Sequence, residues 1–106
     1  MSHQIDDFKS KATPGPTAEV IGGYGYKAVT KTYNYDNAVL VEIERELHEK
    51  ESMGVYNDTV NSDVYRTFTD LKEDGSKIMV IQMMFSKPMT AVLAQLLSAN
   101  ISIKPN

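Results

Sequence analysis

Few side chains in this sequence have a type and spacing that could do chemistry, and the clearest of them is Arg66. It lies in the apolar-rich run Val64–Leu71, which is followed by a second apolar run, Lys77–Phe85. A guanidinium among apolar neighbours favours a carboxylate or an anionic ligand. Arg66 is therefore either a ligand-anchoring group, or a strand-end side chain that reaches water or pairs with Asp63 or a helix glutamate.

The two runs around Arg66 read as a β-hairpin. They are joined by Lys72-Glu73-Asp74-Gly75-Ser76, and Asp-Gly between such runs is the strongest short-range hairpin signal because that turn needs positive φ. A two-residue Asp74-Gly75 turn sets Lys72 opposite Lys77, which is mildly unfavourable. A longer loop that leaves Lys72 outside the ladder is the alternative.

The two-residue turn also predicts which side chains share a face of the hairpin. It pairs Arg66 with Met83 and places both on one face, with Tyr65 and Gln82 on the other. Tyr65 and Gln82 fit either a pocket wall or hydrogen bonds across an interface. Met83 would either line an adaptable pocket or fill the core. These four residues, Tyr65, Arg66, Gln82 and Met83, are the predicted ligand-binding residues.

No residue can be assigned a catalytic role from the sequence. His48 follows Glu44 by four positions, but a metal or acid-base site would need further ligands that the local sequence does not supply. We expect no metal and no cofactor.

Composition restricts the function further. The 106 residues suffice for one domain, and a net charge of −3 gives no reason to expect binding to nucleic acid or an anionic membrane. The absence of cysteine removes disulfides, thiol nucleophiles and cysteine-based metal sites. No run approaches the roughly 18 apolar residues of a membrane span. We expect a cytoplasmic protein.

The N-terminal third of the chain changes character near residue 18. Residues 1–18 are polar, end near Pro14-Gly15-Pro16 and are expected to form a flexible leader, with residues 19–106 as a single domain. The Gly-rich segment Ile21–Tyr26 has no following Lys-Ser/Thr and is expected to be a bend or bulge. Tyr26–Tyr35, rich in Tyr, Thr and Val, predicts a strand.

Two helices are expected on either side of the hairpin. The first starts at Asp36 or Asn37 and runs to about Met53, with an apolar stripe that contains Val39, Leu40, Ile43 and Leu47. The second opens at Ser86-Lys87-Pro88 and ends near Asn100. A short closing strand, Ile101–Ile103, follows.

The predicted order is that of the ferredoxin-like βαββαβ fold, a four-stranded antiparallel sheet with two helices on one face. Both faces of the hairpin are apolar, so the face without helices would expose an unusually large apolar patch. We therefore expect a homodimer in which two sheets pack face to face about a two-fold axis.

The element order over Tyr24–Ile103, with the segment YRTFTDLKEDGSKIMVIQMMFSKP, resembles the dimeric α/β-barrel superfamily, which includes antibiotic-biosynthesis-monooxygenase-like and stress-responsive barrel proteins. This resemblance implies a dimer with a pocket against the sheet, which in different members holds polyketides, haem or other apolar molecules. It carries no residue assignments.

Three functions remain open. The first is binding of a small apolar or aromatic molecule by a dimeric barrel. The second is a cofactor-independent monooxygenase or isomerase, with Tyr65, Arg66 or His48 in acid-base or orienting roles. The third is a structural or regulatory dimer without a ligand.

Overall fold

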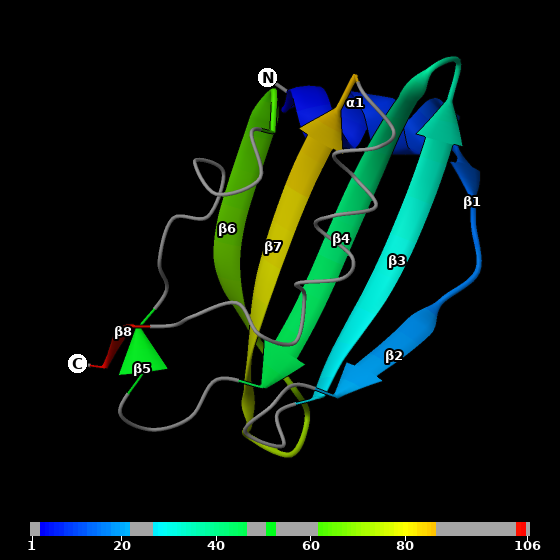
Figure 1. Cartoon of the computed structure of the whole chain (residues 1–106). Helices are drawn as coiled ribbons and strands as arrows, with labels where there is room; N and C mark the ends of the chain where they lie inside the picture. The colour runs from blue at the N-terminus through cyan, green and yellow to red at the C-terminus, as the bar shows by residue number, and fades with distance from the viewer. Residues whose placement is uncertain (1–2, 22–26, 47–50, 53–61, 87–103, 106) are drawn as a thin grey trace.

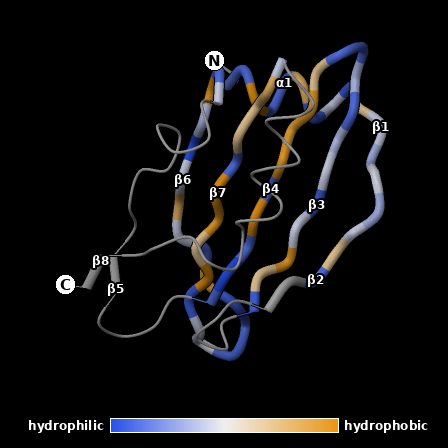
Figure 2. The backbone as a smooth tube through the Cα atoms, viewed as in Figure 1, coloured by the Kyte–Doolittle hydropathy of each residue, from blue (hydrophilic) through white to orange (hydrophobic). Residues whose placement is uncertain are grey.

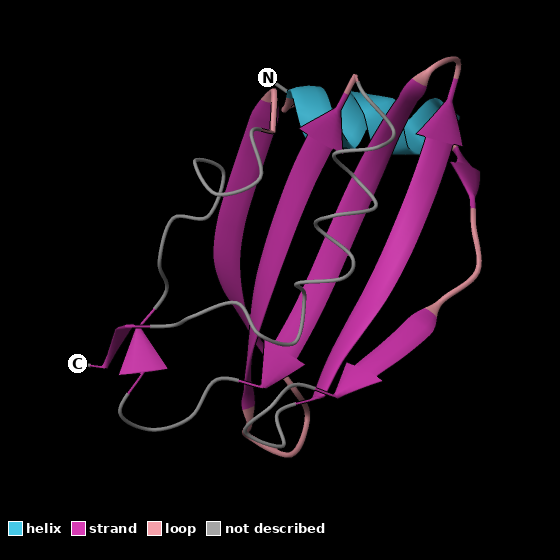
Figure 3. Cartoon of the chain, viewed as in Figure 1, coloured by secondary structure: helices cyan, strands magenta, loops and turns pink. Residues whose placement is uncertain are grey.

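A computed structural model of the chain describes residues 3–21, 27–46, 51–52, 62–86 and 104–105. It is mostly β, with a six-stranded antiparallel sheet and one described helix, α1 (Gln4–Lys11), lying across one end of one sheet face (Figures 1 and 3). The sheet strands are β1 (Thr13–Pro14), β2 (Ala18–Ile21), β3 (Lys27–Tyr35), β4 (Ala38–Glu46), β6 (Val64–Leu71) and β7 (Lys77–Phe85). A separate antiparallel pair joins β5 (Glu51–Ser52) to β8 (Lys104–Pro105).

The strand order across the sheet is β1-β3-β4-β7-β6, and β2 also pairs with β3. β1 and β2 therefore share the outer edge of β3, separated by Gly15-Pro16-Thr17. The backbone N–H of Gly15 donates to the carbonyl of Thr32 at 2.7 Å, which holds this break against β3. The opposite edge of the sheet is β6.

The predicted ferredoxin-like fold is wrong, because the segment expected to form the first helix is strand β4. Asp36 and Asn37 form the turn between β3 and β4 instead of a helix cap, and Asp36 has a φ of +56°. Asp and Asn tolerate this left-handed conformation better than other residues with a side chain. Val39, Leu40 and Ile43 fit a helical stripe, but Val41-Glu42-Ile43-Glu44 also alternates with the period of two that a strand requires.

The resemblance to the dimeric α/β-barrel superfamily is wrong for the same reason. It rested on the order of elements, and the structure has a six-stranded sheet with one described helix in place of βαββαβ. The second predicted helix, beyond Ser86, and the closing strand Ile101–Ile103 lie outside the described residues, as does most of the Gly-rich segment. The strand predicted at Tyr26–Tyr35 is confirmed as β3.

The N-terminal segment, expected to be a flexible leader, contains α1 and β1. The Nδ1 atom of His3 accepts a hydrogen bond from the Ile5 N–H and caps the helix. Acidic residues occupy the first turn of α1 and lysines the last, which suits the helix dipole. Ile5 and Phe8, spaced to lie on one helical face, are buried against Leu40 of β4.

The hairpin of β6 and β7 is confirmed, but its register differs by one residue from the two-residue turn. Leu71 pairs with Lys77, and Arg66 pairs with Gln82. Gly75, at a φ of +87°, donates its N–H to the Lys72 carbonyl. This matches a three-residue loop with glycine in the left-handed position, the longer alternative for this turn.

The observed registers define two faces of the sheet. On the helix face, which α1 partly covers, the central strands carry Leu40, Glu42, Glu44 and Glu46 from β4 and Ile78, Val80, Gln82 and Met84 from β7. The aliphatic face carries Val39, Val41, Ile43 and Arg45 from β4 and Met79, Ile81, Met83 and Phe85 from β7. Figure 2 shows the resulting hydrophobic stretches on these central strands.

The aliphatic face of the central strands is buried within a single chain. Val41, Ile43, Met79 and Met83 have no exposed surface, and Ile81 has 1%. The homodimer was expected because one sheet face would be left bare. The aliphatic face of the central strands is not bare, so this argument for a dimer does not apply. A face-to-face dimer stays a prediction.

Candidate functional site

The four residues predicted from the sequence do not form one site. The register places Arg66 opposite Gln82 on the helix face, and Tyr65 opposite Met83 on the aliphatic face. Met83 is completely buried, whereas Tyr65 is 36% exposed. The pairs Arg66–Gln82 and Tyr65–Met83, on opposite faces, therefore replace the predicted grouping of Arg66 with Met83 and of Tyr65 with Gln82.

Arg66 joins α1 to the hairpin. Its two terminal nitrogens donate to the two carboxylate oxygens of Asp6, at 2.7 and 3.1 Å, and its Nε donates to Gln82 Oε1 at 2.9 Å. Asp6 thus occupies the position in which a ligand carboxylate was expected. Paired parallel bonds of this kind are the strongest arginine–carboxylate geometry.

The hydrogen bonds continue from Gln82 to the central strand β4. Gln82 Nε2 donates to Glu42 Oε2 at 2.7 Å, and the same oxygen accepts from Lys9 Nζ of α1 at 2.9 Å. Glu42 and Gln82 are both buried, at 4% and 2% exposure. We call the five residues Asp6, Arg66, Gln82, Glu42 and Lys9 the helix clamp, because both ends of the hydrogen-bond chain lie on α1.

Charges within the helix clamp stabilise one another. The hydrogen bond from Arg66 lowers the pKa of Asp6 below its usual 3.8, and the bond to Asp6 raises the pKa of Arg66. Burial lowers the pKa of Lys9, but the hydrogen bond and charge of Glu42 outweigh burial and raise it overall. Each charge in the clamp has a partner of opposite sign, so the clamp serves to hold α1 on the sheet.

The sequence reasoning missed three of the five clamp residues. Asp6 and Lys9 lie in the segment that was expected to be a flexible leader, and Glu42 lies in the segment that was expected to form the first helix. The available signals were the acidic first turn of α1 and the alternation of Glu42 with Val41 and Ile43.

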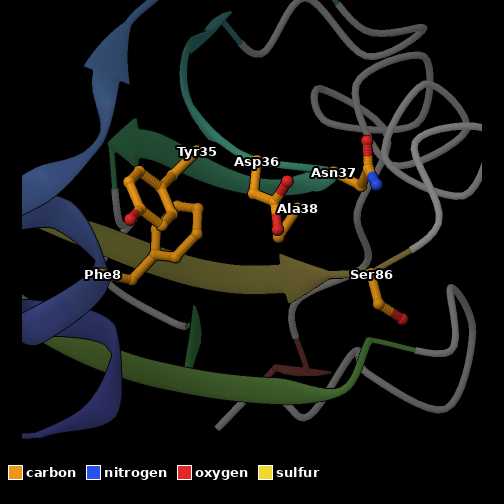
Figure 4. A pocket seen from close by; sticks show the side chains of 6 residues that line it. All are labelled: Phe8, Tyr35, Asp36, Asn37, Ala38 and Ser86. Atoms are coloured by element: carbon orange, nitrogen blue, oxygen red, sulfur yellow. The ribbon is translucent and has the colours of Figure 1, made fainter.

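A separate hollow lies where α1 meets the turn between β3 and β4. It has a volume of about 330 Å³ and is lined by Phe8, Tyr35, Asp36, Asn37, Ala38 and Ser86. Figure 4 shows Phe8 and Tyr35 at one end, Ser86 at the other, and Asp36 and Ala38 between them. We call this hollow the turn pocket.

The aromatic end of the turn pocket is built by contacts between α1 and β3. The rings of Phe8 and Tyr35 meet edge to face, with centroids 6.3 Å apart, and Lys11 Nζ lies 4.7 Å from the centroid of Tyr35. Ser86 is held in place by a 2.7 Å hydrogen bond from its N–H to Asp63 Oδ2. The lining of the pocket thus combines an aromatic wall with one carboxylate, that of Asp36, while the ammonium of Lys11 lies beside the Tyr35 ring.

None of the four predicted ligand-binding residues lines the turn pocket. Of the residues given catalytic roles in the oxygenase hypothesis, Tyr65 and Arg66 lie elsewhere, and His48 is outside the described residues. No group of His, Asp and Glu side chains within the described ranges could hold a metal ion. In the same part of the chain, no helix is long and apolar enough to cross a membrane.

Comparison of this chain with protein-family models, with curated proteins and with solved structures found no match.

Proposed function

We propose that the protein binds a small aromatic molecule carrying a cationic group, and that the turn pocket is its binding site. The observation that supports this proposal is the aromatic wall of Phe8 and Tyr35 beside the carboxylate of Asp36. Binding sites for small molecules combine an apolar wall with a few polar groups that fix orientation.

The size of the turn pocket suits a small ligand. Its volume of about 330 Å³ is near the lower end of the roughly 300–1,000 Å³ range of ligand sites. Tyr35 is 46% exposed, so its ring offers apolar surface that a ligand could cover. Asp36 offers a negative charge that favours an ammonium over a neutral or anionic substituent.

The proposal is tested by NMR titration of the isotope-labelled protein with phenethylamine and, in parallel, with the neutral phenethyl alcohol. We expect concentration-dependent shifts of the Asn37, Ala38 and Ser86 amide signals, with tighter binding of the amine. The amide of Lys77, at the far end of β7, serves as an internal control. Absence of saturable shifts at the three pocket amides with both compounds would reject the turn pocket as a binding site.

Asp36→Asn is the matched variant for the charge. Asn tolerates positive φ as Asp does, so the turn keeps its conformation while the carboxylate is lost. We expect the variant to bind the amine and the alcohol with similar affinity. If Asp36→Asn retained the preference for the amine, the assignment of Asp36 as the cation-binding group would be wrong.

A further inference from the structure

The two edges of the sheet differ in a way that points to a partner. The β1/β2 edge is interrupted at Gly15-Pro16-Thr17, and Pro14 within β1 has no N–H to donate. Breaks and prolines are the devices by which proteins prevent edge strands from pairing with other chains. β6 is eight residues long, contains no proline, and pairs among the described strands only with β7.

The side chains of β6 are unusually exposed for their type. Leu71 is 67% exposed, Phe68 38% and Tyr65 36%. These residues lie on both faces of the strand, because Tyr65 and Leu71 share the aliphatic face while Phe68 lies on the helix face. An added strand along this edge would contact all three.

The backbone of β6 has the orientation that strand addition requires. The Lys72 N–H donates to the Ser76 carbonyl, so the backbone at position 72 points toward β7. Backbone direction alternates along an antiparallel strand, so the N–H and C=O groups of Tyr65, Thr67, Thr69 and Leu71 point away from β7. The Leu71 N–H donates to Asp70 Oδ1 at 3.0 Å, and strand addition would exchange this local bond for one to the added strand.

From these observations we infer that β6 pairs with β6 of a second copy of this chain, antiparallel and with Phe68 on the two-fold axis. In this register Phe68 faces the partner's Phe68, and Thr67 faces the partner's Thr69. Tyr65 lies opposite the partner's Leu71. The outward-pointing positions of the two strands therefore meet each other, and the six-stranded sheets join into one continuous sheet.

Charge favours this register over the other two-fold axes along β6, those at Thr67 and Thr69 included, because it alone places Arg66 opposite an acidic residue of the partner strand. With Phe68 on the axis, Arg66 lies opposite the partner's Asp70, and this attractive pair occurs twice in the dimer. An axis at Arg66 or at Asp70 would place like charges opposite each other. Arg66 uses three of its five N–H donors in the bonds to Asp6 and Gln82, so its guanidinium can share its charge with another carboxylate.

The dimer is expected to be weak, because two eight-residue strands bury little surface beside the roughly 1,600 Å² of a standard interface. Sedimentation equilibrium of the full chain should show a shift from 11.8 kDa toward twice that mass as concentration rises through the micromolar range. A single 11.8 kDa species at millimolar concentration would overturn the inference. Binding of an extended peptide of another sequence along β6 would not rescue it, because the inferred partner is a second copy of this chain.

Asp70→Lys tests the charge pair. It makes both Arg66 contacts repulsive and should raise the dimer dissociation constant about tenfold. Glu73→Lys is the matched control, because it changes net charge equally at an exposed position in the hairpin loop, beyond the paired residues. Equal effects of the two substitutions would overturn the proposed register, while circular dichroism confirms that both variants fold.

Single cysteines test the register directly, because the natural chain contains none. At a two-fold axis between non-hydrogen-bonded positions, Cα atoms lie about 4.5 Å apart, within the range that a disulfide spans. Phe68→Cys should therefore oxidise to a covalent dimer several times faster than Thr67→Cys, which faces position 69. Glu19→Cys, on the opposite edge of the sheet, is the control. Cross-linking of position 68 at the rate of position 19 would overturn the inference.

Discussion

Arg66 of β6 donates two parallel hydrogen bonds to the carboxylate of Asp6 in α1, although the two residues are 60 positions apart in the chain. The same arginine bonds Gln82, which bonds Glu42 on the central strand. The N-terminal helix is thereby connected to three strands by polar contacts in addition to the apolar contacts of Ile5 and Phe8. Both the helix clamp and the turn pocket contain residues of α1, so both need this helix to stay packed on the sheet.

Acid should release the Asp6–Arg66 contact. The pKa of Asp6 is lowered in the folded protein, so the contact stabilises the fold above the unfolded value of 3.8. That contribution is lost as pH falls through the lower, folded pKa. We expect the NMR signals of Asp6 and its neighbours in α1 to titrate below pH 3.8. Asp6→Asn should abolish this titration, and a midpoint at or above 3.8 in the natural chain would contradict the contact.

Ile5→Ala should destabilise the whole protein. Ile5 is fully buried, and removing its side chain leaves a cavity that costs about 2–5 kcal/mol of unfolding free energy. Denaturant unfolding measures the change, and Gln4→Ala, at an exposed position of the same helix turn, is the control. Equal stability of the two variants would mean that the N-terminal segment is the flexible leader expected from its composition.

Glu42→Ala should cost more than Glu44→Ala, although the two glutamates lie on the same face of β4. Loss of Glu42 leaves the buried Gln82 amide without its acceptor, which costs about 1–3 kcal/mol. Glu44 is 30% exposed and pairs with the half-exposed Lys31 at 3.2 Å, a contact worth under about 1 kcal/mol. Thermal unfolding of the two variants gives the comparison. A larger loss for Glu44→Ala would contradict the assignment of Glu42 to the clamp.

Gly75→Ala should destabilise the hairpin through backbone strain alone. A Cβ atom at Gly75 would meet no atom within 4 Å, but the φ of +87° is unfavourable for alanine by about 1–2 kcal/mol. Gly75→Asn should cost less, since asparagine adopts left-handed conformations more readily. Denaturant unfolding of the two variants decides the point, and an equal loss for both would contradict a purely conformational origin.

The hairpin was predictable because its signal is local. Asp74-Gly75 between two apolar runs specifies a turn wherever it occurs. The register was not, because a loop longer by one residue changes every cross-strand partner. That single residue moved Arg66 from Met83 to Gln82, and so changed which of the four predicted residues share a face of the hairpin.

The strand β4 was mistaken for a helix because its sequence supports both. Asp36-Asn37 suits a helix cap as well as a tight turn, and Val39, Leu40 and Ile43 fit a helical stripe. The sheet decides between them, because β3 and β7 pair with the two edges of β4 along its length and satisfy its backbone as a strand. No local pattern reports such tertiary contacts.

The candidate sites were beyond sequence reasoning for a related reason. The helix clamp joins residues from α1, β4, β6 and β7, and the turn pocket joins Phe8 to residues 35–38 and Ser86. Their proximity follows from the sheet order, which the wrong fold prediction did not provide.

The alternation along β4 also constrains how the chain folds. Sliding β4 by one residue against β3 and β7 would turn Glu42, Glu44 and Glu46 into the hydrocarbon layer and Val41 and Ile43 out of it. Burying ionised carboxylates without partners costs free energy, so a sheet in that register would be less stable than the native one. The glutamates on one face of β4 thus favour the native register of the sheet over a register shifted by one residue.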